Sequence, residues 1–185
     1  MKRTLIYSLM IALLSMTFLS APSPAAAAEK YHYDFQKTYQ PWVPGAWLYP
    51  VTKDTLRVKY EKTAAGLNGF AALTVLSTDA VWMLNAFEPT GNTVTVQFDA
   101  RRLTATEYLV PIIYVGDGKP SGIGDFQKVG LTLDASWQTY TFETTLKAET
   151  IVVALGFMDL HDDPFGSLLS HQGAFDNVTV KISDE

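Results

Sequence analysis

The stretch Thr93-Val-Thr-Val-Gln-Phe-Asp-Ala-Arg101 alternates between apolar and polar side chains. In an extended chain its two valines and its phenylalanine fall on one face, while its threonines, Gln97 and Asp99 fall on the other. A period of two is typical of a strand with one face in a core and the other toward solvent. The stretch therefore predicts a half-buried β-strand.

Short apolar segments of similar length recur on both sides of this strand, separated by Gly, Pro, Asn and Asp. About ten short strands, rich in Val, Thr, Tyr and Phe, predict an all-β antiparallel β-sandwich or jelly roll. Residues 110–115 and 151–155 are apolar on both faces, and we expect them in the middle of a sheet. The other expected strands are residues 31–37, 56–60, 69–76, 80–87, 108–115, 129–133, 138–144, 151–158 and 174–182.

The beginning of the chain has the three parts of a secretory signal peptide. Lys2 and Arg3 precede a largely apolar run at 5–19, and small residues follow at 21–28. The run is shorter than the roughly 20 apolar residues that a membrane-spanning helix needs. We expect cleavage after Ala28, which leaves one domain at 29–185, secreted to the extracellular space or the cell envelope.

The net charge of this domain limits the classes of partner that we expect it to bind. Loss of Lys2 and Arg3, with no acid in the same segment, takes the net charge from −5 to −7. An acidic surface disfavours nucleic acid and anionic membranes, so we expect neither as a partner. The chain has no cysteine, so its stability must come from its core, which a domain of this size can supply. We expect a monomer.

Several phrases occur in an order that resembles a known family. Tyr33-Asp34-Phe35-Gln36 is followed by tryptophans, and Gly69-Phe-Ala-Ala-Leu-Thr-Val75 precedes the alternating strand. Leu131-Thr-Leu-Asp-Ala-Ser-Trp-Gln-Thr-Tyr-Thr-Phe142 and Phe175-Asp-Asn-Val-Thr-Val180 follow it. Together they resemble the carbohydrate-binding modules of the family 4/9 kind, within the galactose-binding-like jelly rolls. The resemblance implies a stand-alone, non-catalytic module that binds a polysaccharide or oligosaccharide, with Trp137 assigned to the fold.

The resemblance also implies a candidate cofactor. Members of the family often carry a structural calcium, held by an acid in the first strand, by loop carbonyls and by the Asp of the last-strand phrase. Asp176 matches that Asp, but Gln36 stands where the first-strand acid is expected, and Asp34 could replace it only with a shifted register. Calcium wants six to eight oxygens, several of them charged. The alternative is an Asp that makes an ordinary turn contact.

Sugar sites combine flat aromatic faces with planar polar groups. Trp47 and Trp82 are our candidates for stacking on a sugar ring, and Gln97 and Arg101 are our candidates for bonding its hydroxyls. Trp42 shares the loop of Trp47, and the two could instead plug one end of the core. For Gln97 and Arg101 the alternative is an ordinary solvated strand face.

The segment Asp159-Leu-His161-Asp162-Asp163 is the densest polar feature, and His171 follows ten residues after His161. His161 is a further candidate for ligand contact. Two His and several carboxylates can hold a transition metal, but the spacing matches no metal motif, and a plain turn is the simpler alternative.

Catalysis and protein binding are the rival function classes. A jelly-roll glycosidase or polysaccharide lyase would need a facing pair of carboxylates or a base such as His161 or His171. The candidate carboxylates are Glu88, Glu107, Glu143, Asp159 and Asp163. None stands in a recognised catalytic phrase. An exposed apolar loop around Trp42 and Trp47 would instead favour an adhesion domain that binds protein.

Overall fold

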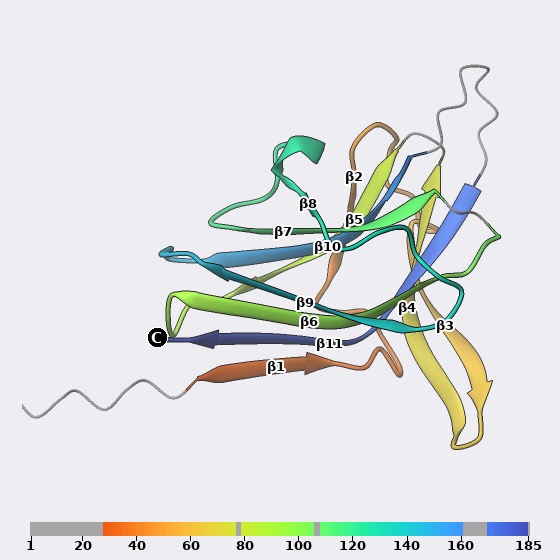
Figure 1. Ribbon diagram of the computed structural model, residues 1–185, viewed down its shortest axis with the longest axis horizontal. Coiled ribbons are helices and arrows are strands. Elements are labelled where there is room, and N and C mark those ends of the chain that lie inside the picture. The colour runs from red at the N-terminus through yellow and green to blue at the C-terminus, as the bar shows by residue number, and fades with distance from the viewer. Residues whose placement is uncertain (1–27, 77–78, 106–107, 161–169, 185) are drawn as a thin grey trace, which may run out of the picture.

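A computed structural model describes residues 28–76, 79–105, 108–160 and 170–184. In these residues the chain forms two antiparallel sheets that face each other, as the two layers of strands in Figure 1 show. The elements are β1 (Glu29–Tyr33), β2 (Val43–Ala46), β3 (Leu56–Thr63), β4 (Gly66–Leu76), β5 (Ala80–Phe87), β6 (Thr93–Arg102), β7 (Leu109–Gly116), the 3₁₀ turn η1 (Ile123–Asp125), β8 (Gln127–Lys128), β9 (Gln138–Thr145), β10 (Ile151–Asp159) and β11 (Ser170–Ser183).

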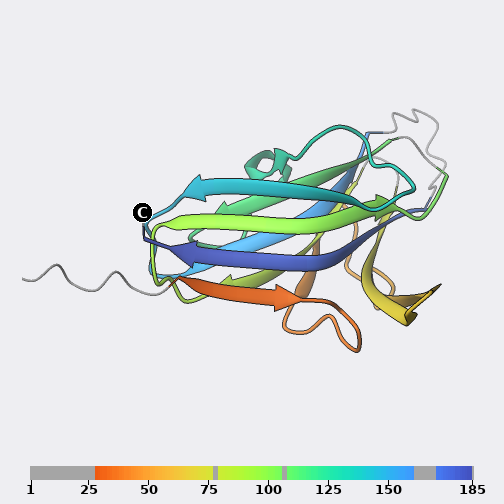
Figure 2. The ribbon, with the colours of Figure 1, turned by 60° about the horizontal axis from the view of Figure 1, so that its bottom comes forward.

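One sheet has the strand order β2-β5-β10-β7-β8, and the other has the order β3-β4-β11-β6-β9, with β1 also paired to β11. The long strand β11 pairs with β6 along one edge. Along its other edge it pairs first with β4 and then with β1. Figure 2 shows β9, β6, β11 and β1 lying side by side. The β3–β4 hairpin extends away from these strands at one end of the sheet (Figure 1).

The core lies between the two sheets and takes alternate residues from their strands. Phe157 of β10 stacks on Phe175 of β11, with ring centroids 4.3 Å apart and planes only 5° apart. A Cβ at Gly173 would lie 2.4 Å from the Phe157 ring. A side chain at that position would therefore displace the stacked pair.

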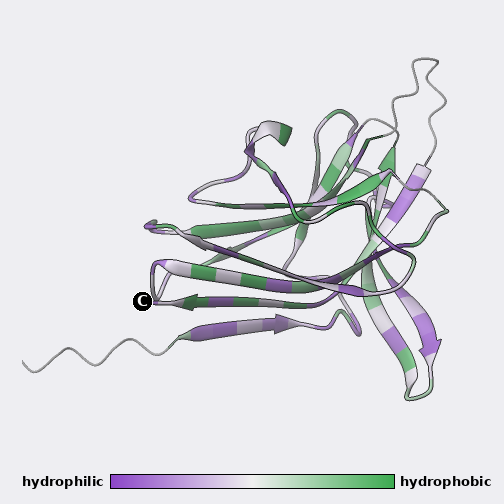
Figure 3. Ribbon diagram, viewed as in Figure 1, coloured by the Kyte–Doolittle hydropathy of each residue, from purple (hydrophilic) through white to green (hydrophobic). Residues whose placement is uncertain are grey.

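The all-β sandwich expected from the sequence is confirmed. The strand built on 93–101 appears as β6, with Val94, Val96 and Phe98 fully buried in the core. In Figure 3, β6 shows the alternating bands of its pattern, whereas β10 is green along most of its length. The expectation that 151–155 lies mid-sheet is also confirmed, because β10 is the central strand of its sheet.

Three local expectations were wrong. The first strand ends at Tyr33 rather than at 37, because Phe35 has a φ of 51° and turns the chain. The Pro- and Trp-rich segment contains β2, which was not expected. Residues 129–133 do not form a strand. Gly130, with a φ of 83°, breaks the extended path there, and only Val129 and Leu133 donate backbone bonds to β7.

Within the described ranges, no helix has the length and the apolar character needed to cross a membrane. The expected signal peptide, apart from Ala28, lies outside the described residues.

Candidate functional site

The outer face of the five-stranded sheet carries a row of small residues around one tryptophan. Val81 and Met83 of β5 point into the core, so Trp82 between them points to the outer face. The strand register places Gly45 of β2 and Gly156 of β10 directly beside Trp82. Glycine on both neighbouring strands leaves room for a large ring to lie down on the sheet.

The Trp82 indole uses this room. A Cβ at Gly45 would lie 2.2 Å from Trp82 Nε1, and one at Gly156 would lie 2.9 Å from the Trp82 Cβ. The ring therefore extends across β2 instead of standing away from the sheet. Any larger residue at Gly45 would push the ring off.

Tyr114 of β7 lies on the same face, and its ring also lies along the sheet over a glycine. Its hydroxyl leans over Gly116, where a Cβ would lie 2.0 Å from the Tyr114 Oη, and it donates a hydrogen bond of 2.8 Å to the carbonyl of Gly118. Burial raises the pKa of Tyr114, although the bond to Gly118 works in the opposite direction. The phenol therefore stays protonated near neutral pH.

Phe126 joins the two rings from the loop between β7 and β8. Its centroid lies 5.0 Å from that of Trp82 and 5.9 Å from that of Tyr114. The loop before Phe126 is held by Asp125, whose carboxylate accepts from the backbone and side chain of Ser121. Trp82 is only 7% exposed. We call Trp82, Tyr114 and Phe126 the aromatic platform.

The platform suits the stacking of an apolar ligand face. Aromatic rings bury large areas and prefer flat or edge contacts, and binding sites are lined mostly by apolar and aromatic groups with a few polar groups among them. Sequence analysis identified Trp82 but missed Tyr114 and Phe126. The available signal was a tyrosine in an otherwise apolar central strand, followed by a glycine-rich loop that ends in phenylalanine.

Gln97 and Arg101 lie on the outer face of the other sheet. Both belong to β6, whose even-numbered residues Val96, Phe98 and Ala100 face the core. Gln97 is exposed. The two sequence candidates therefore lie on the opposite side of the sandwich from Trp82. The expectation that Trp82 and this pair contact one sugar is wrong, because β5 and β6 belong to different sheets.

Arg101 is also engaged within the protein. Its guanidinium lies 2.5 Å from the Glu61 carboxylate and 4.4 Å from the Trp137 ring centroid. Phe70 lies under the same guanidinium at 5.3 Å. Trp137 Nε1 donates to Glu61 at 2.9 Å. We call Glu61, Phe70, Arg101 and Trp137 the arginine cluster. Its contacts hold β3, β4 and β6 together, which is a structural role.

The two tryptophans that flank β2 have different surroundings. Trp42 is 1% exposed and packs edge-on against Tyr33 and Phe87, with centroid distances of 5.4 and 6.4 Å. Trp42 therefore packs in the core, which was the alternative to sugar contact in the sequence analysis, and it has no ring face free for a ligand. Trp47 is 48% exposed. His161 lies outside the described residues.

Asp176 stands at the end of a relay of amides. Gln36 Oε1 accepts from the backbone N–H of Gly69 at 3.2 Å, which fixes the orientation of the Gln36 amide. Its Nε2 then donates to Asn68 Oδ1 at 2.8 Å, and Asn68 Nδ2 donates to Asp176 Oδ2 at 2.9 Å. The backbone N–H of Asn177 donates to Asp176 Oδ1 at 2.8 Å.

This arrangement does not fit a calcium ion. Calcium needs several oxygens directed at it, whereas both Asp176 oxygens face N–H donors. Burial raises the pKa of Asp176, and the charges of Asp99 and Asp34 raise it further. Across the described ranges, no group of three or more His, Cys, Asp or Glu side chains is placed to hold a metal. The side-chain amide of Asn68 and the backbone N–H of Asn177 donate to the carboxylate instead.

Calcium removal should therefore leave the melting temperature nearly unchanged. A structural calcium present at 100 times its Kd would add about 2.7 kcal/mol of stability, which is roughly 5–10 °C in Tm for a domain of this size. Thermal unfolding with chelator and with excess calcium measures this directly, with magnesium as the control ion. A drop of several degrees in chelator that calcium restores and magnesium does not would show that the protein binds a stabilising calcium and would contradict this prediction.

No family model matches the chain, and no curated protein matches it. Solved structures do share its fold. TmCBM61 in complex with beta-1,4-galactotriose is 11% identical, with a TM-score of 0.52 over 77% of this chain and 88% of that one. The CBM22-1 xylan-binding domain of Paenibacillus barcinonensis Xyn10C is 10% identical, with a TM-score of 0.52 over 87% and 99% of the two chains.

The cleaved adhesin domain of Lys-gingipain from Porphyromonas gingivalis is 9% identical, with a TM-score of 0.54 over 84% and 99% of the two chains. At such identities the likeness shows the fold alone. The structural neighbours include carbohydrate-binding modules of jelly-roll fold from families 61 and 22, which are other families than the 4/9 kind expected from the sequence.

Proposed function

We propose that the protein is a secreted, non-catalytic carbohydrate-binding module that holds a polysaccharide or oligosaccharide on the aromatic platform. The observation that carries the proposal is the posture of Trp82 and Tyr114, which lie down over Gly45 and Gly116 on one outer sheet face. Tyr114 and Phe126 are half-buried and can stack on the C–H face of a pyranose, whereas Trp82 is buried and packs against Phe126. Solved structures of the same fold include one in complex with beta-1,4-galactotriose and one described as xylan-binding.

The catalytic alternative has less support. Asp159 and His171 were candidates for a catalytic acid or base, but both are buried, and His171 Nδ1 lies 2.5 Å from Asp159 Oδ2. A buried pair bonded in this way joins the ends of β10 and β11, which favours a structural role. Export is part of the proposal on the strength of the signal sequence at 1–28.

One observation favours protein adhesion as a second candidate. Four apolar residues on β2 and in the loop that follows it are about half exposed: Val43, Trp47, Leu48 and Val51. Large exposed apolar patches often mark interaction surfaces. An adhesion domain also appears among the proteins of the same fold.

Tyr114→Ala should weaken polysaccharide binding about tenfold or more, because stacking on one aromatic ring contributes roughly 1–3 kcal/mol in comparable sites. Tyr114→Phe is the matched control, since it keeps the ring and removes only the hydroxyl that bonds Gly118. Binding isotherms of residues 29–185 on a panel of insoluble and immobilised polysaccharides, with soluble oligosaccharide as competitor, measure the effect.

Equal retention of the Tyr114→Ala variant and the parent chain on a glycan that both bind would remove the platform from the proposal. Retention of the parent chain on no glycan at all would favour the adhesion candidate. The exposed patch around Trp47 would then be the surface to substitute.

A further inference from the structure

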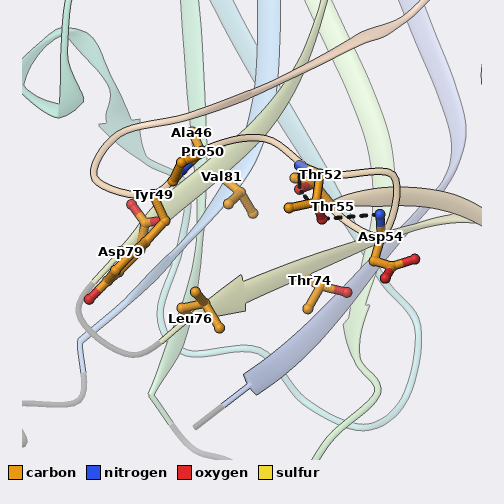
Figure 4. Close-up of a pocket in the computed structure, with 10 residues that line it drawn as sticks. All are labelled: Ala46, Tyr49, Pro50, Thr52, Asp54, Thr55, Thr74, Leu76, Asp79 and Val81. Atoms are coloured by element: carbon orange, nitrogen blue, oxygen red, sulfur yellow. Dashed lines mark hydrogen bonds between the residues drawn. The ribbon is translucent and has the colours of Figure 1, made fainter. Parts of the chain in front are cut away.

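A hollow lies at one end of the sandwich, between the two sheets and apart from the aromatic platform. Figure 4 shows its lining residues, which come from the loop between β2 and β3, from the end of β4 and from the start of β5. Its volume is about 260 Å³. Tyr49, Pro50, Leu76 and Val81 give it apolar walls. We call it the end pocket.

Asp79 supplies the end pocket with a buried carboxylate. The residue is 1% exposed, and its Oδ1 accepts from the backbone N–H groups of Leu48 and Ala80 at 2.9 and 2.7 Å. Within the part of the chain that the structure describes, Oδ2 receives no hydrogen bond. This oxygen is the acceptor that the carboxylate can offer to an O–H or N–H of a ligand.

Threonine hydroxyls add polar groups to the same lining. Thr55 Oγ1 accepts from the backbone N–H of Thr52 at 2.9 Å, which fixes the loop. Thr74 Oγ1 accepts from Gln172 Nε2 at 3.1 Å. Because a hydroxyl carries one proton of its own, Thr74 keeps a donor for a ligand oxygen. The end pocket therefore offers an acceptor, a donor and apolar walls within one small volume.

We propose that the end pocket binds a single terminal hexopyranose residue, with a hydroxyl or amine of the sugar donating to Asp79 and its C–H face against Tyr49 and Pro50. Pockets for drug-sized ligands measure about 300–1,000 Å³, so the end pocket suits one sugar residue rather than a chain. The inference rests on the proposed function only for the class of ligand.

The charge of the lining sets the selectivity among sugars. Among the described residues, the lining contains two acids, Asp54 and Asp79, and no Lys or Arg, and Arg57 pairs with Asp54 from outside the lining. Asp79 is therefore the acid that decides which sugars the pocket accepts. A carboxylate on the ligand would meet the unbonded oxygen of Asp79, and like charges at close range repel. The end pocket should therefore accept neutral hexoses and hexosamines and reject uronic acids.

Ligand-observed NMR and calorimetry with glucose, galactose, glucosamine and glucuronic acid test the proposal on residues 29–185. We expect binding of at least one of the first three sugars and none of glucuronic acid. Asp79→Asn should weaken that binding at least tenfold, while its Oδ1 still accepts from Leu48 and Ala80 and keeps the fold. Ala46→Leu, which fills the hollow without altering Asp79, should have a similar effect.

The proposal is overturned if no neutral hexose or hexosamine binds, or if neither variant changes the affinity while both melt like the parent chain. Tyr114→Ala separates the two sites. It should leave monosaccharide binding intact while weakening retention on polysaccharide. Unchanged polysaccharide retention in this variant would count against the platform, and weakened monosaccharide binding in it would count against the end pocket as a separate site.

Discussion

Trp42→Ala should lower the free energy of unfolding by about 3–5 kcal/mol, the range for large-to-small substitutions of buried aromatic residues. Trp42 is 1% exposed and contacts Tyr33 and Phe87, so its removal opens a cavity where the first strand meets the other sheet. Denaturant unfolding followed by fluorescence or circular dichroism measures the change.

Trp47→Ala is the matched control, because it removes the same side chain five residues later, on the other side of β2. Trp47 is half exposed, and substitutions on the surface usually change stability by less than about 0.5 kcal/mol. Equal losses of stability in the two variants would contradict the assignment of Trp42 to the core. A selective loss of sugar affinity in Trp42→Ala, with unchanged stability, would restore it as a ligand residue.

Glu61→Ala should destabilise the protein by about 2–3 kcal/mol. Breaking a buried ion pair costs about 3–5 kcal/mol, and we place Glu61 below that range because its side chain is 26% exposed. The substitution leaves the Arg101 guanidinium without its counter-charge and Trp137 Nε1 without its acceptor. Among the described residues, Arg101 already has a buried Nε with no hydrogen bond, so loss of Glu61 adds to its unpaired donors.

The same cluster should give the protein a pH dependence. Burial of Glu61 opposes ionisation, but the hydrogen bonds from Trp137 and Arg101 and the Arg101 charge outweigh it, so the pKa of Glu61 lies below its usual 4.5. An acid with a lowered folded-state pKa stabilises the fold above its unfolded pKa, and that stabilisation is lost as the pH falls through the folded value.

Unfolding curves between pH 7 and pH 3 should therefore show a decline that Glu61→Gln reduces. The Gln variant is the control for shape, since it keeps an acceptor for Trp137 and removes only the charge. Parallel pH profiles for the parent chain and Glu61→Gln would show that the pair contributes nothing through ionisation.

The fold could be predicted from local pattern, whereas the site could not. The alternation of 93–101 identifies a strand and its buried face from neighbouring residues alone. Which strands lie beside one another depends on long-range pairing, and this decides that Arg101 and Trp82 face opposite sides of the molecule. Tyr114 and Phe126 reach Trp82 only because β7 and its loop lie beside β10.

The contacts of Gly45 and Gln36 could not be predicted from the sequence either, because their partners are distant along the chain. Nothing near Gly45 in the sequence reveals that a tryptophan 37 positions later will lie across it. Gln36 stands where the resemblance implies an acid. Its consequence, a chain of amide bonds ending at Asp176, depends on Asn68 from another strand.

The strand order also determines how much of the chain must be available before the two sheets can form. The centre of one sheet is β10 and the centre of the other is β11, and these are the last two strands along the chain. Earlier strands such as β5 and β6 have no central partner until the end of the chain is available. The contact order is correspondingly high, and folding dominated by such distant pairings is slow. A chain that is synthesised from its N-terminus would therefore stay unfolded until β11 has been made, which would suit the export that we propose for this protein.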